Sequence, residues 1–252
     1  MINGIVNVYK ESGFTSFDVV AKMRGIFHQK KIGHTGTLDP DAQGVLPVCL
    51  GRATKVCDLL TDKDKEYEAV MLLGMTTDTQ DVSGNVLSRQ EVTVSEDAVK
   101  TVIASFEGEY MQIPPMYSAL KVNGQKLCDL ARKGIEVERK ARPVTIHKIQ
   151  ILEINLQRVC MRVECSKGTY IRTLCQDIGE KLGCGACMES LLRTRVSEFR
   201  LDGALRLQQI EELVQQEDFS FVQSIDSVFM QYDFAQVMKT AKKMVENGNR
   251  IP

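Results

Sequence analysis

The sequence lacks most features of membrane, metal-binding and exported proteins. Among its 252 residues, no apolar run approaches the roughly eighteen residues that a membrane-spanning helix needs. The amino terminus has no basic segment followed by a long apolar core. Histidines at positions 28, 34 and 147 and one close cysteine pair, Cys184 and Cys187, fall short of the usual ligand set of a structural zinc site. We therefore expect a cytoplasmic protein with no membrane partner and no bound metal.

A large excess of charge is also missing. The net charge is −1, which argues against a protein that coats nucleic acid indiscriminately. The eight cysteines are scattered rather than arranged as a disulfide framework, so reduced thiols are expected. Basic residues cluster only locally, at Lys30 and Lys31, Arg132 and Lys133, Arg139 to Arg142, and Arg193 with Arg195. Any one such cluster is usually a solvated face, so charge alone does not define a partner.

The chain does contain enough apolar residues, 43%, for a sizeable core. Its periodicities predict strands over 2–9, 44–51, 65–74, 144–156, 159–165 and 190–201. They predict helices over 15–28, 53–60, 96–106, 127–134, 170–182, 207–214 and 233–246, with Thr15 or Ser16, Ser95 and Thr169 as amino-terminal caps and Gly183 as a stop. Residues 76–85 are expected to form a loop and 123–124 a turn. Strands outnumber a regular βαβ alternation, which favours an α+β fold whose mixed, largely antiparallel central sheet is flanked by helices.

One polar, glycine-rich segment stands out, "KIGHTGTLDPDAQGVLPV", Lys31 to Val48. Its glycines permit tight bends and close backbone approach, and Pro40 biases Asp39 towards an extended conformation. An aspartate before proline is commonly the first residue of a turn, and a histidine beside glycine is commonly part of a turn with no further role. The segment also lacks the lysine-ended pattern of a phosphate-binding loop. From the residues alone, Asp39 and His34 are either turn residues or members of a site.

Compared as a whole, the sequence resembles the bacterial tRNA pseudouridine synthase B (TruB) family. "GHTGTLDPDAQGVLPVCLGRATK" is similar to the family's catalytic motif. Five further blocks occur in the family's order: "KESGFTS", "KEYEAVMLLGMTTDTQDVSG", "IPPMYSALKVNGQKLCDLARKGIEVERKARPVTIH", "CSKGTYIRTLCQDIGEKLG" and "LLRTRV". The resemblance covers residues from about 7 to 200. It implies the pseudouridine synthase fold and an isomerase of the intramolecular transferase type.

The reaction implied by this resemblance converts uridine 55 in the T-loop of tRNA to pseudouridine without a cofactor. The N-glycosidic bond breaks, the base rotates and a C–C bond forms, so a carboxylate beside the sugar carbon can stabilise or trap positive charge. The target base must leave its stack first. The implied partner is the T-arm of tRNA, bound by a monomer. The sequence leaves open whether modification or assistance to tRNA folding is the main role.

Site residues carry over one by one. Asp39 matches the catalytic aspartate, Arg172 the arginine that pairs with it, and Tyr67 the tyrosine that stacks on the target base and can take part in proton transfer. Among substrate-binding positions, His34 matches the histidine that inserts into the T-loop stack and Leu191 the apolar residue that lines the base pocket. Lys10 matches a lysine near the site. Arg193 and the run Arg139 to Arg142 are expected to contact phosphates.

Residues 1–240 are expected to form the catalytic domain, and 241–252 to begin a carboxy-terminal RNA-binding (PUA-like) domain that is truncated or absent.

Two other functions are alternatives to this one. A glycoside hydrolase could use Asp39 but normally needs a second carboxylic acid, and no other acid is marked by the matching blocks. A non-catalytic RNA-binding module would explain the basic clusters but not the presence of Asp39 together with Arg172.

Overall fold

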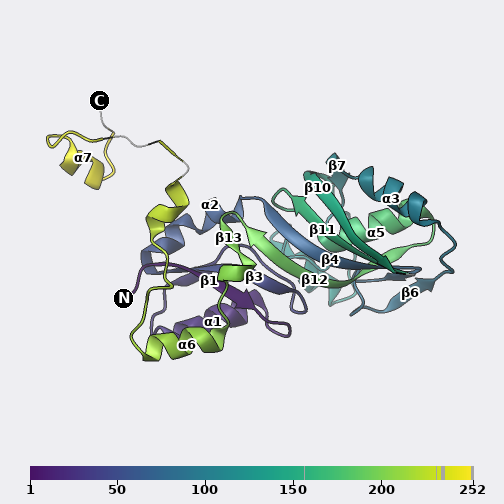
Figure 1. Cartoon of the computed structure of the whole chain (residues 1–252), viewed down its shortest axis with the longest axis horizontal. Coiled ribbons are helices and arrows are strands. Elements are labelled where there is room, and N and C mark those ends of the chain that lie inside the picture. The colour runs from purple at the N-terminus through teal and green to yellow at the C-terminus, as the bar shows by residue number, and fades with distance from the viewer. Residues whose placement is uncertain (156, 231, 234–235, 251–252) are drawn as a thin grey trace.

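The computed structural model describes residues 1–155, 157–230, 232–233 and 236–250. One long twisted sheet forms its centre (Figure 1), in the strand order β1-β3-β12-β4-β11-β10-β7, with β2 beside β3 and β13 beside β12. These strands are β1 Gly4–Lys10, β2 Ile32–His34, β3 Gln43–Leu50, β4 Lys65–Leu73, β7 Gly108–Gln112, β10 Arg142–Asn155, β11 Arg158–Cys165, β12 Ala186–Val196 and β13 Phe199–Arg200. Within the described ranges, the pairs are antiparallel except β3 with β12, which is parallel. The predicted α+β class with a mixed, largely antiparallel sheet is confirmed.

The helices are α1 Ser16–Ile26, α2 Cys57–Thr61, α3 Glu96–Ala104, α4 Leu127–Ala131, α5 Ile171–Leu182, α6 Leu207–Gln215 and α7 Lys242–Glu246, with 3-10 turns η1 Gly51–Val56, η2 Leu201–Gly203 and η3 Ile225–Phe229. Two small hairpins, β5 Met75–Thr77 with β6 Val86–Arg89 and β8 Lys121–Val122 with β9 Gln125–Lys126, lie outside the main sheet. Among the described residues, no helix combines the length and apolar character needed to cross a bilayer.

The end of the sheet formed by β1 and β3 is covered on both faces. Successive strand side chains point to opposite faces, so Val6, Val8, Leu46 and Val48 pack against α1 and α6, whereas Ile5, Val45 and Cys49 pack towards η1 and α2. Figure 1 shows α1 and α6 side by side beneath these strands. The continuous apolar run of β3 follows from this double coverage.

The other end of the sheet is covered on one face. In β4 and β11, buried and partly exposed residues alternate, and the buried set packs with α3 and α5 in one core cluster. The opposite face carries ion pairs between strands: Arg162 of β11 pairs with Glu68 of the neighbouring β4 at 2.6 Å, and Arg158 of β11 reaches across β4 to Glu189 of β12 at 2.8 Å. Helix α5 lies close to the sheet because Gly179 has no side chain: a Cβ there would come within 2.2 Å of the Ala186 nitrogen.

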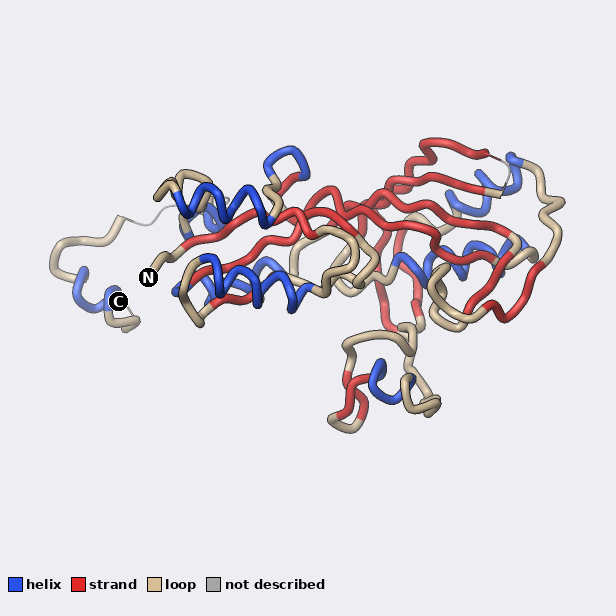
Figure 2. Tube along the Cα trace, turned by 90° about the horizontal axis from the view of Figure 1, so that it is seen from below, coloured by secondary structure: helices blue, strands red, loops and turns tan. Residues whose placement is uncertain are grey.

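A small unit leaves the sheet between β7 and β10. Residues 113–141, called the insert below, contain the β8–β9 hairpin and α4, and their neck is closed by the pairing of Gln112 with Arg142. The insert has a separate apolar cluster around Met116, Leu127 and Leu130. In Figure 2 this unit of one hairpin and one short helix projects from the main body.

Several local predictions are confirmed and others are wrong. Thr15 and Ser95 cap α1 and α3 through their side chains, and Gly183 ends α5 with φ 77°. Thr169 was expected to cap α5, but its hydroxyl donates to the Ser166 carbonyl and Tyr170 occupies the cap position. Residues 76–85 are not wholly loop, because they include the end of β5. Among the described residues of the helix expected over 233–246, Lys242–Glu246 are helical and the others are not. Residues 156 and 234–235, which the predicted elements include, lie outside the described residues.

Candidate active site

The glycine-rich segment folds as strand β2, a loop of residues 35–42, and strand β3. Strand pairing fixes its two ends, with His34 opposite Val48. The middle is held from α1, because the Ser16 hydroxyl accepts the Leu38 N–H at 2.9 Å and donates to the Leu38 carbonyl at 3.3 Å. These contacts fix the backbone immediately before Asp39.

Lys10 fixes the backbone on the other side of Asp39. Its side chain is fully buried, and Nζ donates to the carbonyls of Pro40 at 2.9 Å, Ala42 at 2.5 Å and Glu11 at 3.1 Å. Burial lowers the pKa of Lys10 to about 8, and the nearby carboxylates of Asp39 and Asp41 oppose that shift. The sequence placed Lys10 near the site, and it does lie there. In the structure its amino group bonds to carbonyls of the loop and so shapes it.

Gly44 allows β3 to approach β12 closely where the two strands pair. Its φ is 105°, and a Cβ there would lie 2.2 Å from the Arg193 carbonyl oxygen and 2.9 Å from the Arg193 nitrogen. Gly44 and Arg193 are register partners in the parallel β3–β12 pair. A side chain at position 44 would therefore separate the strand that follows the loop from the strand that carries Leu191.

Asp39 pairs with Arg172 through two contacts. The Arg172 Nε lies 2.9 Å from Asp39 Oδ2, and Nη2 donates to Oδ1 at 3.2 Å. The arginine side chain is 5% exposed and the aspartate side chain 38% exposed. A two-point pair of this kind fixes the carboxylate plane as well as its position. One edge of an oriented carboxylate is left accessible from outside.

Further acceptors hold the Arg172 guanidinium. Nη1 donates to the Thr79 carbonyl at 2.9 Å, Nη2 donates to the Tyr117 carbonyl at 2.9 Å, and Asp81 Oδ2 lies 3.5 Å from Nη1. Asp81 was not singled out from the sequence, where it is one of several polar residues in an expected loop. No spacing within the chain indicates that this loop reaches the start of α5.

Burial raises the pKa of Asp39 above its ordinary value. The Arg172 guanidinium opposes this shift, and the Asp81 carboxylate adds to it. The ionised form of Asp39 is therefore favoured chiefly by the buried Arg172 guanidinium, and also by the buried Lys10. The Asp81 carboxyl group lies against the same guanidinium.

Tyr67 and Arg193 are neighbours in the interior. They are register partners across β4 and β12, and are 8% and 1% exposed. Burial raises the pKa of Tyr67, and the adjacent Arg193 guanidinium opposes that rise. Arg193 donates to the Val45 carbonyl at 2.7 Å and to the Gly36 carbonyl at 3.4 Å. The expectation that Arg193 contacts phosphate is corrected, because a buried guanidinium bonded to carbonyls inside the protein does not reach an RNA backbone.

His34 and Leu191 border the same region. His34 is partly buried at the end of β2, and its Nδ1 is buried without a hydrogen-bond partner among the described residues. Burial and the Arg193 charge lower the pKa of His34, which favours a neutral ring. Leu191, opposite Ala69 in the β12–β4 pair, packs against the core cluster that contains Tyr67 and Leu38. Expected residues from four strands, one helix and the loop thus meet near Asp39.

The basic run Arg139 to Arg142 lies at the returning end of the insert. Arg139 donates to the Pro114 carbonyl at 3.2 Å and pairs with Glu136 at 3.1 Å. Lys140 and Arg142 are exposed. Their charges are available at the neck of the insert.

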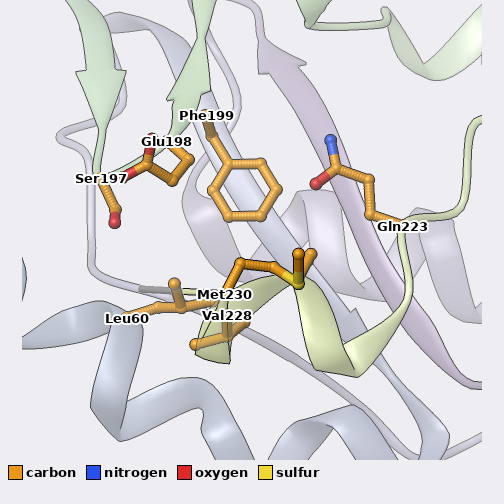
Figure 3. Close-up of a pocket in the computed structure, with 8 residues that line it drawn as sticks. Leu60, Ser197, Glu198, Phe199, Gln223, Val228 and Met230 are labelled. Atoms are coloured by element: carbon orange, nitrogen blue, oxygen red, sulfur yellow. The ribbon is translucent and has the colours of Figure 1, made fainter. Parts of the chain in front are cut away.

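One hollow of the molecule lies away from these residues. A cavity of about 310 Å³ is bordered by Leu60, Phe199, Gln223 and Met230 (Figure 3), and no expected site residue lines it. Within the described part of the chain, no three His, Cys, Asp or Glu side chains are grouped so that they could hold a metal ion. The candidate site lies around Asp39, whose side chain is 38% exposed.

Comparison with known proteins connects this geometry to a family. Residues 24–171 match the model described as TruB family pseudouridylate synthase (N terminal domain), and residues 172–235 match that of the tRNA pseudouridylate synthase B C-terminal domain. The tRNA pseudouridine synthase B of Lachnoclostridium phytofermentans is 58% identical, over 99% of this chain and 84% of that protein. The chain belongs to the TruB family. It is a pseudouridine synthase that acts on tRNA, and hence an isomerase.

A second TruB relative and two solved structures agree. The tRNA pseudouridine synthase B of Alkaliphilus oremlandii is 50% identical over 99% of this chain and 83% of that protein. The Cbf5 structure solved as a Cbf5-Nop10-Gar1 complex shares 33% identity with a TM-score of 0.72, and an H/ACA RNP bound to a substrate RNA shares 30% with a TM-score of 0.69. Each match covers 89% of this chain, which spans 61% and 60% of those longer chains. The pseudouridine synthase fold expected from the sequence is confirmed.

The two family models also divide the site. Asp39 and Tyr67 fall in the first matched segment, whereas Leu191 falls in the second and Arg172 is its first residue. The site of this TruB member is completed only when both segments are present.

Proposed function

We propose that this TruB member converts uridine 55 in the T-loop of tRNA to pseudouridine, with Asp39 as the essential carboxylate. The observation that carries the proposal is the two-point pairing of a partly exposed Asp39 with a buried Arg172. In the reaction the bond from the sugar C1′ to N1 of uracil breaks, a bond from C1′ to C5 forms, C5 loses its proton and N1 gains one. Atoms and electrons balance within the substrate, so no cofactor is needed.

Each of the three chemical steps open to Asp39 requires its ionised form. A carboxylate can attack the sugar carbon, attack the base ring, or accept a proton, and all three need a lone pair that protonation would remove. Arg172 supports that form by donating from two nitrogens. The held orientation leaves the remaining lone pairs for a substrate that arrives from outside.

Extrusion of the target nucleotide from the T-loop is part of the proposal. A base in a folded stack exposes neither its sugar carbon nor its ring to a protein carboxylate. His34, whose pKa is lowered, would offer a neutral aromatic ring to fill the vacated stack, a contact that unstacked RNA favours. Tyr67 and Leu191 would line the pocket for the flipped base, supported by their packing beside Leu38.

The remaining expectations stand as parts of the same proposal. Residues 1–240 act as the catalytic domain, and the T-arm of tRNA is bound by a monomer. Lys140 and Arg142, exposed at the neck of the insert, contact phosphates. The tRNA substrate is consistent with action in the cytoplasm.

The direct test is site-resolved detection of product. Full-length unmodified tRNA is incubated with the protein, and pseudouridine is mapped along the RNA. We expect modification at position 55, and none when that uridine is replaced by cytidine. Modification at another position of the first RNA would overturn the T-loop assignment, and absence of pseudouridine from both RNAs would overturn the proposed activity.

A further inference from the structure

Both the oxygen and the nitrogen of the Gln112 side-chain amide are hydrogen-bonded inside the protein. Gln112 is 1% exposed, at the end of β7. Its Oε1 accepts the Tyr170 N–H at 2.8 Å, and its Nε2 donates to the Tyr170 carbonyl at 3.0 Å and also to the Tyr110 hydroxyl. Both backbone groups of Tyr170 are therefore bonded to one buried side chain that lies 58 residues earlier in the chain.

Tyr170 is the residue from which α5 starts. It occupies the cap position, and its own side chain makes no capping hydrogen bond. The first N–H groups of a helix need partners from outside the helix. Gln112 bonds the N–H of the cap residue itself, two positions before Arg172. The direction in which α5 leaves Tyr170 determines where the Arg172 side chain begins.

The same segment also holds the arginine head group. The chain continues from Gln112 through Pro114 and Pro115 to Tyr117, whose carbonyl accepts from Arg172 Nη2 at 2.9 Å. The segment 112–117 thus contacts Arg172 in two places. Gln112 holds the backbone before it through Tyr170, and the Tyr117 carbonyl accepts from its guanidinium. Gln112 is also the register partner of Arg142, so it stands at the neck of the insert.

We propose that Gln112 is a positioning residue for pseudouridine formation, holding the start of α5 so that the Arg172 guanidinium meets Asp39 through both of its contacts. The inference rests on the function proposed above. Gln112 touches neither Asp39 nor the guanidinium; it acts through Tyr170. Its amide cannot be replaced by a group that only accepts or only packs, because Tyr170 presents one donor and one acceptor to it.

The fold does not depend on Gln112 alone. On the other side of Arg172, the Thr173 hydroxyl donates to Gln80 Oε1 at 2.7 Å. Apolar residues of α5, including Leu174 and Ile178, are fully buried in the main core cluster. A change at position 112 therefore leaves α5 packed on the sheet while releasing its cap residue, Tyr170.

The test compares Gln112→Met and Gln112→Glu with the wild type and with Gln150→Met, a change of the same type at an exposed position of β10. Single-turnover pseudouridine formation and tRNA binding are measured across pH. For Gln112→Met we expect the rate at saturating tRNA to fall about 10- to 100-fold, with binding within about 3-fold, since small misplacements of catalytic groups have effects of that size. Gln112→Glu, which keeps the acceptor for the Tyr170 N–H, should be intermediate, and Gln150→Met should match the wild type.

A second readout separates positioning from general support of the fold. Arg172 favours the ionised form of Asp39, so a displaced guanidinium should move the acid limb of the rate profile to higher pH in Gln112→Met. A Gln112→Met rate within 2-fold of wild type, or a reduced rate with an unmoved acid limb, would overturn the inference. If Gln112→Met does not fold, the same two criteria apply to Gln112→Glu. A wild type that makes no pseudouridine would instead overturn the proposed function.

Discussion

The backbone carbonyl of Asp39 accepts the N–H of Ala42 at 3.2 Å, while its carboxylate accepts from Arg172. The first contact is that of a turn, and the second is that of an oriented carboxylate in a site. The two interpretations of Asp39 that the sequence leaves open are therefore compatible. The turn, held by Ser16 on one side and Lys10 on the other, directs the carboxylate towards α5.

The pKa of Asp39 gives a prediction for activity against pH. Burial raises this pKa above the ordinary value of 3.8, and the reaction needs the ionised form. Activity should therefore be full above the raised pKa and should fall as the pH decreases through it, with a midpoint higher than that of an exposed aspartate. Single-turnover rates between pH 4 and 8, about the range over which the fold of such proteins is retained, would locate the midpoint.

Asp41→Asn serves as the control for this profile. Asp41 is exposed, lies two residues from Asp39, and has the same charge. Its removal should leave the midpoint nearly unchanged, whereas Arg172→Met should move it upward because the main opposing charge is lost. A wild-type midpoint at or below the ordinary aspartate value would contradict the described environment of Asp39.

At the scale of elements, the close pairing of β3 with β12 sets the relation between the loop and Leu191, the residue proposed to line the base pocket. Gly44→Ala places a methyl group against the Arg193 backbone at a positive φ, so the strands must separate. We expect the free energy of unfolding to fall by about 2–4 kcal/mol, a range typical of backbone strain and overpacking. Denaturant titration measures it.

Gly25→Ala provides a matched comparison. Gly25 lies within α1, and a Cβ there would meet no heavy atom within 4 Å. Replacing a helical glycine with alanine should raise stability by about 0.5–1 kcal/mol. Equal effects of the two substitutions would show that close approach at Gly44 is not what the fold requires.

Sequence periodicity and capping residues predict most of the helices and strands. The predictions that are wrong depend on contacts between residues far apart in the sequence. Alternation located β4, β10 and β11, and capping residues located α1 and α3. The prediction of Thr169 as the cap of α5 is wrong because the side chain that bonds the actual cap residue, Tyr170, belongs to Gln112, far away in sequence. Asp81 was missed for the same reason, since its relevance depends on Arg172, 91 positions later. Arg193 was given a surface role because basic residues are usually exposed, and only the pairing of β12 with β3 and β4 shows its burial.

At the scale of the whole molecule, the candidate site lies where the doubly covered and singly covered parts of the sheet meet. Asp39 comes from the loop before β3, Arg172 from α5, and the carbonyl of Tyr117 from the insert. Asp39 and Arg172 are 133 residues apart in sequence. Assembly of the site therefore requires the complete sheet, and the insert is connected to it through the acceptor that Tyr117 provides.

This arrangement separates binding from chemistry. The groups proposed to contact the RNA, His34 and the basic residues at the neck of the insert, are distinct from the Asp39–Arg172 pair. Loss of the Asp39 charge should therefore affect the chemical step far more than the association with tRNA. Arg172 keeps Asp81 and two carbonyl acceptors in an Asp39→Asn protein, so the fold should be retained.

The most direct test is the single-turnover rate of pseudouridine formation at position 55 by Asp39→Asn, with tRNA affinity and thermal unfolding measured on the same protein and Asp41→Asn as the matched charge control. We predict a rate at least about 1,000-fold below wild type, the scale of losing an essential catalytic group, with tRNA affinity and folding close to wild type and with Asp41→Asn active. An Asp39→Asn protein that forms pseudouridine as fast as wild type would contradict the account.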